Sequence, residues 1–177
     1  MKQIKFLLIP LTAAILMTAG CDKKPSAEAA AETSGNWQIK ADSLSKANPA
    51  DIKADLTLLN EVTNTTNADA LALRDEVLKA GTDQEKIKDV LSKSNDLQKK
   101  VKEKIMAMNL KSAEVQNIRT QMIDNLMTSE KLYDISTASN FNMQAPTEEF
   151  IQLSQRSVAI QQKLGSELNA LNAQYAQ

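Results

Sequence analysis

The sequence predicts an all-α protein, an antiparallel four-helix bundle (up-down-up-down) of long amphipathic helices preceded by a disordered tether. Three observations predict this class. Apolar residues repeat at steps of three and four along the chain after residue 48. Glycine and proline number only four each, and aromatic residues, at 3%, are too few for a typical all-β core. Helix-capping residues divide the pattern into segments of similar length, which pack most simply as antiparallel neighbours.

The first helix is expected to begin at Asn48-Pro49, where an N-cap residue precedes a first-turn proline. Its apolar stripe runs from Ile52 to Val77, and Gly81 then ends the helix. The sequence Thr82-Asp83-Gln84-Glu85 has the form of a capping box and is expected to open the second helix. The buried side of that helix carries Ile87, Val90, Ser94, Leu97, Val101, Ile105 and Met108.

Two interpretations exist for the boundary between the second and third helices. Asn109 to Ser112 contains no glycine or proline and the apolar phase continues through it, so one unbroken helix over 82–138 is an alternative. We expect a turn at Asn109–Ser112, with Ser112 as the cap, because helices of equal length then pack antiparallel. The third helix carries Val115, Ile118, Met122, Leu126, Ser129, Leu132 and Ser136.

A connection that contains Phe141 and ends around Pro146-Thr147 leads to the fourth helix, whose stripe runs from Phe150 to Tyr175. Small hydroxyl side chains occupy several inward positions of the bundle. Such groups usually hydrogen-bond a backbone carbonyl one turn back, and the alternative is that they line a narrow internal pocket. They are Thr63, Thr66, Ser94, Ser129, Ser136 and Ser157.

Residues 1–20 have the three parts of an export signal. Lys2 and Lys5 form the positive start, residues 6–17 form an apolar run, and small residues follow. The run is too short for an ordinary membrane-spanning helix and contains Pro10. Cys21 comes next and is the only cysteine, so it has no disulfide partner within the chain.

The ending Thr18-Ala19-Gly20-Cys21 resembles the lipobox of bacterial lipoproteins, although Thr18 replaces the usual leucine. The resemblance implies signal cleavage between Gly20 and Cys21, a diacylglyceryl group on the Cys21 thiol and usually an acyl chain on the new amine. Two or three such chains make membrane anchoring stable. Asp22 resembles a retention signal for the inner membrane of enterobacteria, and both the inner and the outer membrane remain alternatives.

The expected organisation is therefore a signal peptide (1–20), a lipidated flexible tether (21–35) and a helical bundle domain (36–177). The tether is small and charged and lacks large apolar residues, so it cannot bury enough surface to become ordered. Trp37, Ala41 and Leu44 have helical spacing and are expected to form a short leading helix. Trp37 is expected to pin this segment to the core rather than to bind a ligand.

Candidate chemistry is sparse. The sequence has no histidine, which removes the commonest general acid/base and metal ligand. Carboxylates such as Asp51 and Asp55 interleave with lysines, as on solvated helix faces. Met106 and Met122, with Met108 and Met127 nearby, are weak candidates for a Cu(I) site, but methionine more often fills gaps in a core. We expect no enzyme activity, no catalytic residue and no cofactor.

The chain after residue 20 carries 19 basic and 22 acidic residues, a near balance that predicts no binding to nucleic acid or to anionic lipid head groups. The leading hypothesis is a lipoprotein of the bacterial cell envelope, anchored through Cys21 and facing the periplasm, whose bundle binds another envelope protein. The alternatives are a small-ligand carrier with a pocket in the bundle core and a periplasmic holdase-type chaperone.

Overall fold

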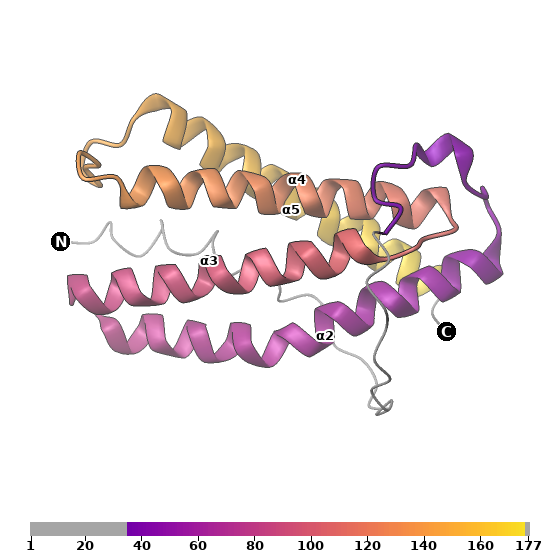
Figure 1. Cartoon of the computed structure of the whole chain (residues 1–177), viewed down its shortest axis with the longest axis horizontal. Coiled ribbons are helices and arrows are strands. Elements are labelled where there is room, and N and C mark those ends of the chain that lie inside the picture. The colour runs from indigo at the N-terminus through magenta and orange to yellow at the C-terminus, as the bar shows by residue number, and fades with distance from the viewer. Residues whose placement is uncertain (1–34, 176–177) are drawn as a thin grey trace.

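The computed structural model describes residues 35–175 as a bundle of four α-helices. The short 3₁₀ helix η3 (Ala41–Ser43) comes first. It is followed by α2 (Pro49–Ala80), α3 (Gln84–Ala107), α4 (Ala113–Thr137) and α5 (Glu148–Tyr175). Figure 1 shows that the four helices run alternately in opposite directions, which confirms the predicted helical bundle. The predicted signal peptide, Gly20, Cys21 and the tether up to residue 34 lie outside the described residues.

The ends of α2 are those that the sequence predicts. The side-chain oxygen of Asn48 accepts hydrogen bonds from the backbone N–H groups of Ala50 (3.1 Å) and Asp51 (3.4 Å), and Pro49 occupies the first turn. Gly81 ends the helix with a φ of +58°, a backbone conformation that a residue without Cβ adopts at low cost.

The expected capping box at the start of α3 is wrong by one residue. Asp83, not Thr82, is the N-cap, and its carboxylate accepts from the N–H groups of Glu85 (3.1 Å) and Lys86 (3.3 Å). A carboxylate brings a full negative charge to the positive end of the helix, and it also pairs with the ammonium of Lys86 at 3.2 Å. These two contributions favour Asp83 over the neutral hydroxyl of Thr82.

A connection over residues 108–112 separates α3 from α4, so the predicted turn is confirmed and the single helix over 82–138 is wrong. Ser112 stands at the N-cap position of α4, but the expectation that its side chain caps the helix is also wrong. Its hydroxyl donates to the carboxylate of Asp55 at 2.6 Å, and this charged acceptor lies in the core. The hydroxyl of Ser112 therefore donates to this carboxylate instead of accepting from an N–H at the start of α4, because a hydrogen bond to a charged group is the stronger of the two.

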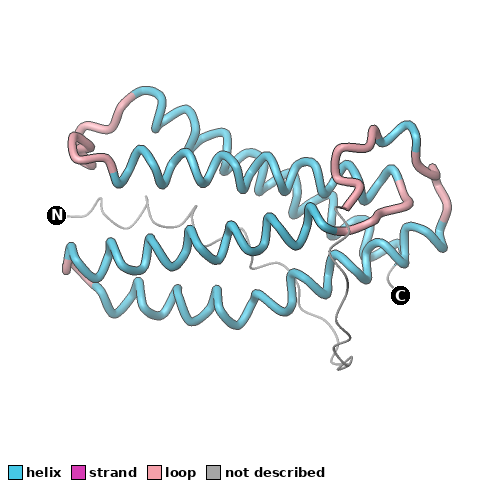
Figure 2. Tube along the Cα trace, in the orientation of Figure 1, coloured by secondary structure: helices cyan, strands magenta, loops and turns pink. Residues whose placement is uncertain are grey.

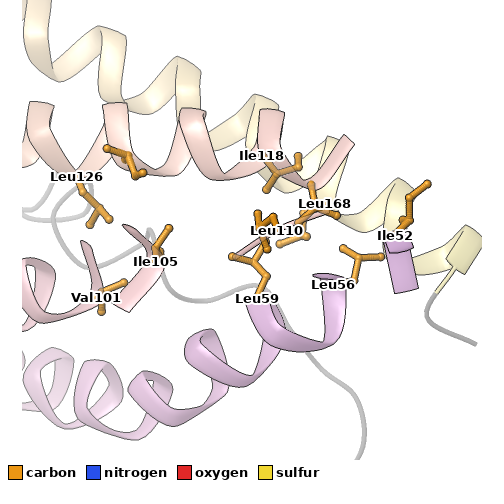
Figure 3. Packing of buried hydrophobic residues seen from close by; sticks show 11 residues of the cluster. Ile52, Leu56, Leu59, Val101, Ile105, Leu110, Ile118, Leu126 and Leu168 are labelled. Carbon is orange, nitrogen blue, oxygen red and sulfur yellow. The ribbon is translucent and has the colours of Figure 1, made fainter. Parts of the chain in front are cut away.

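The apolar core occupies one half of the bundle. It draws on the beginning of α2, the end of α3, the beginning of α4 and the end of α5, which meet because the helices are antiparallel (Figure 3). We call this half, which includes the connection 108–112, the core end. The buried cluster consists of Ile52, Leu56, Leu59, Val101, Ile105, Leu110, Val115, Ile118, Ile123, Leu126 and Leu168.

The opposite half, here called the distal end, contains the α2–α3 turn and the α4–α5 connection (Figure 2). Over their full lengths α2 packs mainly on α3 and α4 packs on both α3 and α5, whereas α2 has few contacts with α4 or α5. The buried apolar residues of the distal end lie outside the main cluster. They are Ala70, Leu73, Ala80, Val90, Leu132 and Phe150.

Several of the inward hydroxyl groups hydrogen-bond within the protein, as the sequence favours. Thr63 donates to the carbonyl of Leu59 at 2.9 Å, and Thr66 donates to that of Val62 at 3.0 Å. Ser157 is buried and donates to the side-chain oxygen of Asn125 at 2.8 Å. These contacts satisfy the hydroxyl donors inside the bundle.

Replacing Leu56 by alanine tests where the core lies. Leu56 is 0% exposed, whereas Leu58, two residues later on the same helix, is 43% exposed. We expect Leu56→Ala to lower the free energy of unfolding by about 2–5 kcal/mol, because it opens a cavity among packed side chains. The control Leu58→Ala should change it by no more than about 0.5 kcal/mol. Urea denaturation followed by circular dichroism measures both, and equal losses would place the core elsewhere.

Candidate functional site: a buried polar junction at the core end

The segment before α2 lies against the connection between α3 and α4. The N–H of Ser45 donates to the carbonyl of Lys111 (2.9 Å), and the carbonyl of Ser45 accepts from the N–H of Ala113 (2.9 Å). Ser45 and Ser112 thereby form an isolated parallel bridge. The expected helix through Trp37, Ala41 and Leu44 is therefore wrong, because only the three-residue η3 forms and the flanking backbone bonds to the connection.

Asn36 joins the same connection through its side chain as well as its backbone. Its backbone N–H donates to the carbonyl of Met108 at 3.2 Å. Its side-chain amide donates to the carbonyl of Leu110 (2.7 Å) and accepts from the N–H of Leu110 (3.0 Å). This pair of bonds reproduces the pattern of two paired strands and holds Asn36 in one orientation.

Among residues 35–175, Arg119 of α4 is the largest side chain that is fully buried. Its guanidinium donates to the carbonyl of Met108 (2.6 Å), to both oxygens of Asn36 (3.0 and 2.8 Å) and to the side-chain oxygen of Gln116 (2.7 Å). Burial lowers the pKa of Arg119 to about 10, while the charge of Asp55 acts in the opposite direction. The group is therefore a cation at neutral pH, and it links three separate segments of the chain.

Asp55 of α2 is the anionic counterpart of Arg119. It is 1% exposed, so its expected place on a solvated helix face is wrong. One carboxylate oxygen accepts from the N–H of Lys111 (2.9 Å), the N–H of Ser112 (2.7 Å) and the hydroxyl of Ser112 (2.6 Å). A buried carboxylate needs such donors to replace the water it has lost, and the connection supplies them.

Two further contacts complete this junction, which we define as Asn36, Asp55, Ser112, Gln116 and Arg119. The side-chain amide of Gln116 donates to the carbonyls of Trp37 (3.0 Å) and Ile39 (2.8 Å). Trp37 packs against the apolar core, as the sequence predicts.

Gly35 lies just before the junction, where the chain approaches α3 most closely. A Cβ at this position would overlap the carbonyl oxygen of Met106 and the backbone of Ala107. Only glycine leaves room for this approach. The chain that leads back toward Cys21 therefore meets the bundle where α3 ends.

The junction holds separate segments of the chain together. Its two charged groups make hydrogen bonds to protein donors and acceptors that come from the N-terminal segment, α2, the connection and α4. The two charges do not share a direct ion pair. Each is instead surrounded by neutral partners, which fixes the register of all four segments at one place.

Sequence reasoning missed the junction, although a signal existed. Asp55 stands three residues after Ile52, and Arg119 stands four residues after Val115, so each charge shares the inward face of its helix. A charged residue within an apolar stripe marks a buried polar contact. The partners of these charges, Asn36 and the backbone of the connection, have no periodicity that could have revealed them.

Three of the four candidate methionines pack as core residues, as the sequence favours. Met106, Met108 and Met122 pack against the apolar cluster, whereas Met127 is exposed on α4. The structure therefore does not bring Met127 together with the other three. Among residues 35–175, no group of three or more histidine, cysteine, aspartate or glutamate side chains could hold a metal ion.

The fold and the junction define a class: a helical bundle domain fixed at one end to the chain that leads toward a lipobox-like cysteine. A family model described as "Uncharacterised lipoprotein PM1805" matches residues 53–176. The chain belongs to this family of bacterial lipoproteins. No curated protein matches it, and no solved structure does. None of the helices between residues 35 and 175 has the length and apolar character needed to cross a membrane.

Replacing Asp55 by alanine tests the junction. We expect a loss of about 3–5 kcal/mol in the free energy of unfolding, because the change leaves Arg119 buried without its countercharge and three donors without an acceptor. The segment before α2 should also detach, so trypsin should cut after Lys40 faster than in the wild-type protein. Mass spectrometry of the fragments measures this cleavage.

The matched control is Glu61→Ala, which removes an exposed carboxylate from the same helix. It should change neither the stability nor the cleavage rate at Lys40 appreciably. An Asp55→Ala variant as stable as Glu61→Ala would mean that the junction contributes little to holding the segment.

Proposed function

We propose that this protein is a lipoprotein of the cell envelope, anchored through lipid on Cys21 and facing the periplasm, whose bundle binds another envelope protein. The observation that carries the proposal is the exposure of large apolar side chains on helices of the distal end. Leu71 and Leu78 lie on α2, and Ile151 and Val158 lie on α5. Leu78 is 70% exposed, the largest fraction among these four residues.

The spacing of these residues supports binding to an extended partner. Leu71 and Leu78 are seven residues apart, as are Ile151 and Val158, so each pair shares one face of its helix. Paired apolar side chains on an exposed helix face are suited to a partner helix with its own apolar stripe. Water-exposed leucines gain free energy when such a partner covers them.

The position of the pairs also supports the proposal. The chain that leads toward Cys21 joins the bundle at the core end, beside Ala107. Leu78 lies near the other end of α2, roughly 44 Å along the helix from Pro49 at 1.5 Å per residue. Figure 1 shows that the α2–α3 turn, close to Leu78 in the chain, lies at the end of the bundle opposite to the first described residues, which supports a partner that binds away from the point of attachment.

We propose binding rather than catalysis because the sequence has no histidine and no recognised nucleophile motif. We prefer a protein partner to a small ligand in the core because inward hydroxyls such as Thr63, Thr66 and Ser157 already donate within the bundle. A holdase-type chaperone would bind many exported clients through the same apolar side chains. The experiment below separates a single partner from many.

Site-specific photocrosslinking in living cells tests the proposal. A photoreactive amino acid at Leu78 or Ile151 of the full-length lipoprotein should give one discrete adduct with the same envelope protein. The control position is Thr57, which is exposed on α2 at the core end and should give no such adduct. Adducts of many sizes would indicate a chaperone, and equal labelling from all three positions would contradict a partner at the distal end.

A further inference from the structure

We propose that a basic strip at the core end docks on the anionic head groups of the membrane that holds the lipid anchor. The strip consists of Lys99, Lys100 and Lys104 of α3 and of Lys111 in the connection. This inference rests on the anchoring through Cys21 proposed above. The docking would fix the bundle with its core end on the bilayer and its distal end directed away from it.

The local charge around the strip differs in sign from that of the domain. Residues 99–111 contain five lysines and one glutamate, whereas residues 35–175 together contain 17 basic and 19 acidic residues. The near balance over the whole chain gave no reason to expect contact with anionic lipids. The distribution along the chain changes this expectation, because residues 99–111, which run from α3 into the connection at the core end, carry a net positive charge.

The four ammonium groups of the strip are available for binding. All four lysines are exposed, and none forms an ion pair with another residue in the range 35–175. Their neighbour Lys102 differs, since it is partly buried and pairs with Glu130 at 2.6 Å. Lys93, further back on α3, pairs with both Glu76 and Asp89. The strip lysines therefore differ from these two neighbours on α3, whose ammonium groups are already bound by carboxylates.

The junction places this strip beside the point of attachment. Gly35 packs on the backbone of Met106 and Ala107, which follow Lys104 by two and three residues in the chain. Lys111 donates its own N–H to Asp55, so its position is fixed by the same network. In Figure 1 the end of α3 and the connection to α4 lie at the same end of the bundle as the first described residues.

The tether between Cys21 and Gly35 limits how far the strip can lie from the lipid anchor. Thirteen residues separate Cys21 from Gly35, which span at most about 45–50 Å even when fully extended. A lipid on Cys21 thus keeps the lysines near the head groups, and the second contact becomes an intramolecular one. The attraction between ammonium and lipid phosphate acts within about 8 Å at physiological ionic strength, so the strip must lie on the surface itself.

Energy transfer from the bundle to the bilayer tests the inference. The lipidated full-length protein is reconstituted into vesicles of phosphatidylcholine, with or without phosphatidylglycerol, that carry an acceptor dye on their head groups. The donor dye is attached to Asn109→Cys at the core end or to Ser139→Cys at the distal end, since the thiol of Cys21 is blocked by lipid. Transfer from position 109 should rise in the anionic vesicles, and transfer from position 139 should not.

The decisive variant replaces all four lysines of the strip by glutamine. It should lose the rise at position 109, as should the wild-type protein in high salt. The matched control replaces four lysines outside the strip and removes the same charge, and it should keep the rise. These four are Lys79, Lys86, Lys88 and Lys131.

Three results would overturn the proposal. One is equal transfer from position 109 in both kinds of vesicle, and another is an equal loss in the two four-lysine variants. The third is that the strip variant keeps the rise at position 109, which would show that these lysines do not bring the core end to the anionic surface. Flotation with the vesicles measures the anchoring separately. The Cys21→Ser variant should not float, and only a wild-type protein that also fails to float would count against the anchor.

Discussion

The buried carboxylate of Asp55 holds together parts of the chain that the helices alone would leave apart. It accepts three hydrogen bonds from Lys111 and Ser112, and this fixes the connection between α3 and α4 against α2. Once the connection is fixed, its carbonyls and those of Asn36 become the acceptors for Arg119. The two charges are costly to bury, and hydrogen bonds from the N-terminal segment, the connection and α4 offset this cost.

This network explains why the two ends of the bundle differ. At the core end the polar contacts surround the apolar cluster, so the four helices and the N-terminal segment form one unit. At the distal end the buried apolar residues lie outside the main cluster, and Leu71, Leu78, Ile151 and Val158 are exposed. The core end is thus suited to fix the domain relative to its membrane, and the distal end is suited to meet a partner. We propose that the lysines of the basic strip help to fix the domain on the membrane.

Much of the fold could be predicted because it depends on local patterns. The cap at Asn48, the stop at Gly81 and the stripes of α2 to α5 all follow from residues that are close in sequence. The failures have a common cause. The choice of Asp83 over Thr82 depended on charge, and the bond that Ser112 makes depended on Asp55, which lies 57 residues away. The junction could not be predicted because its partners meet only after the chain has folded.

Amide hydrogen exchange measured by NMR on the lipidated protein tests the central claim most directly, which is that the N-terminal segment is part of the folded bundle. The N–H groups of Asn36, Ser45 and Leu110 donate across the junction. If the junction holds, these amides should exchange only with the opening of the core end, as slowly as those of Ile118 or Leu56. Exchange of Asn36 and Ser45 at the rate of an unstructured peptide would contradict it.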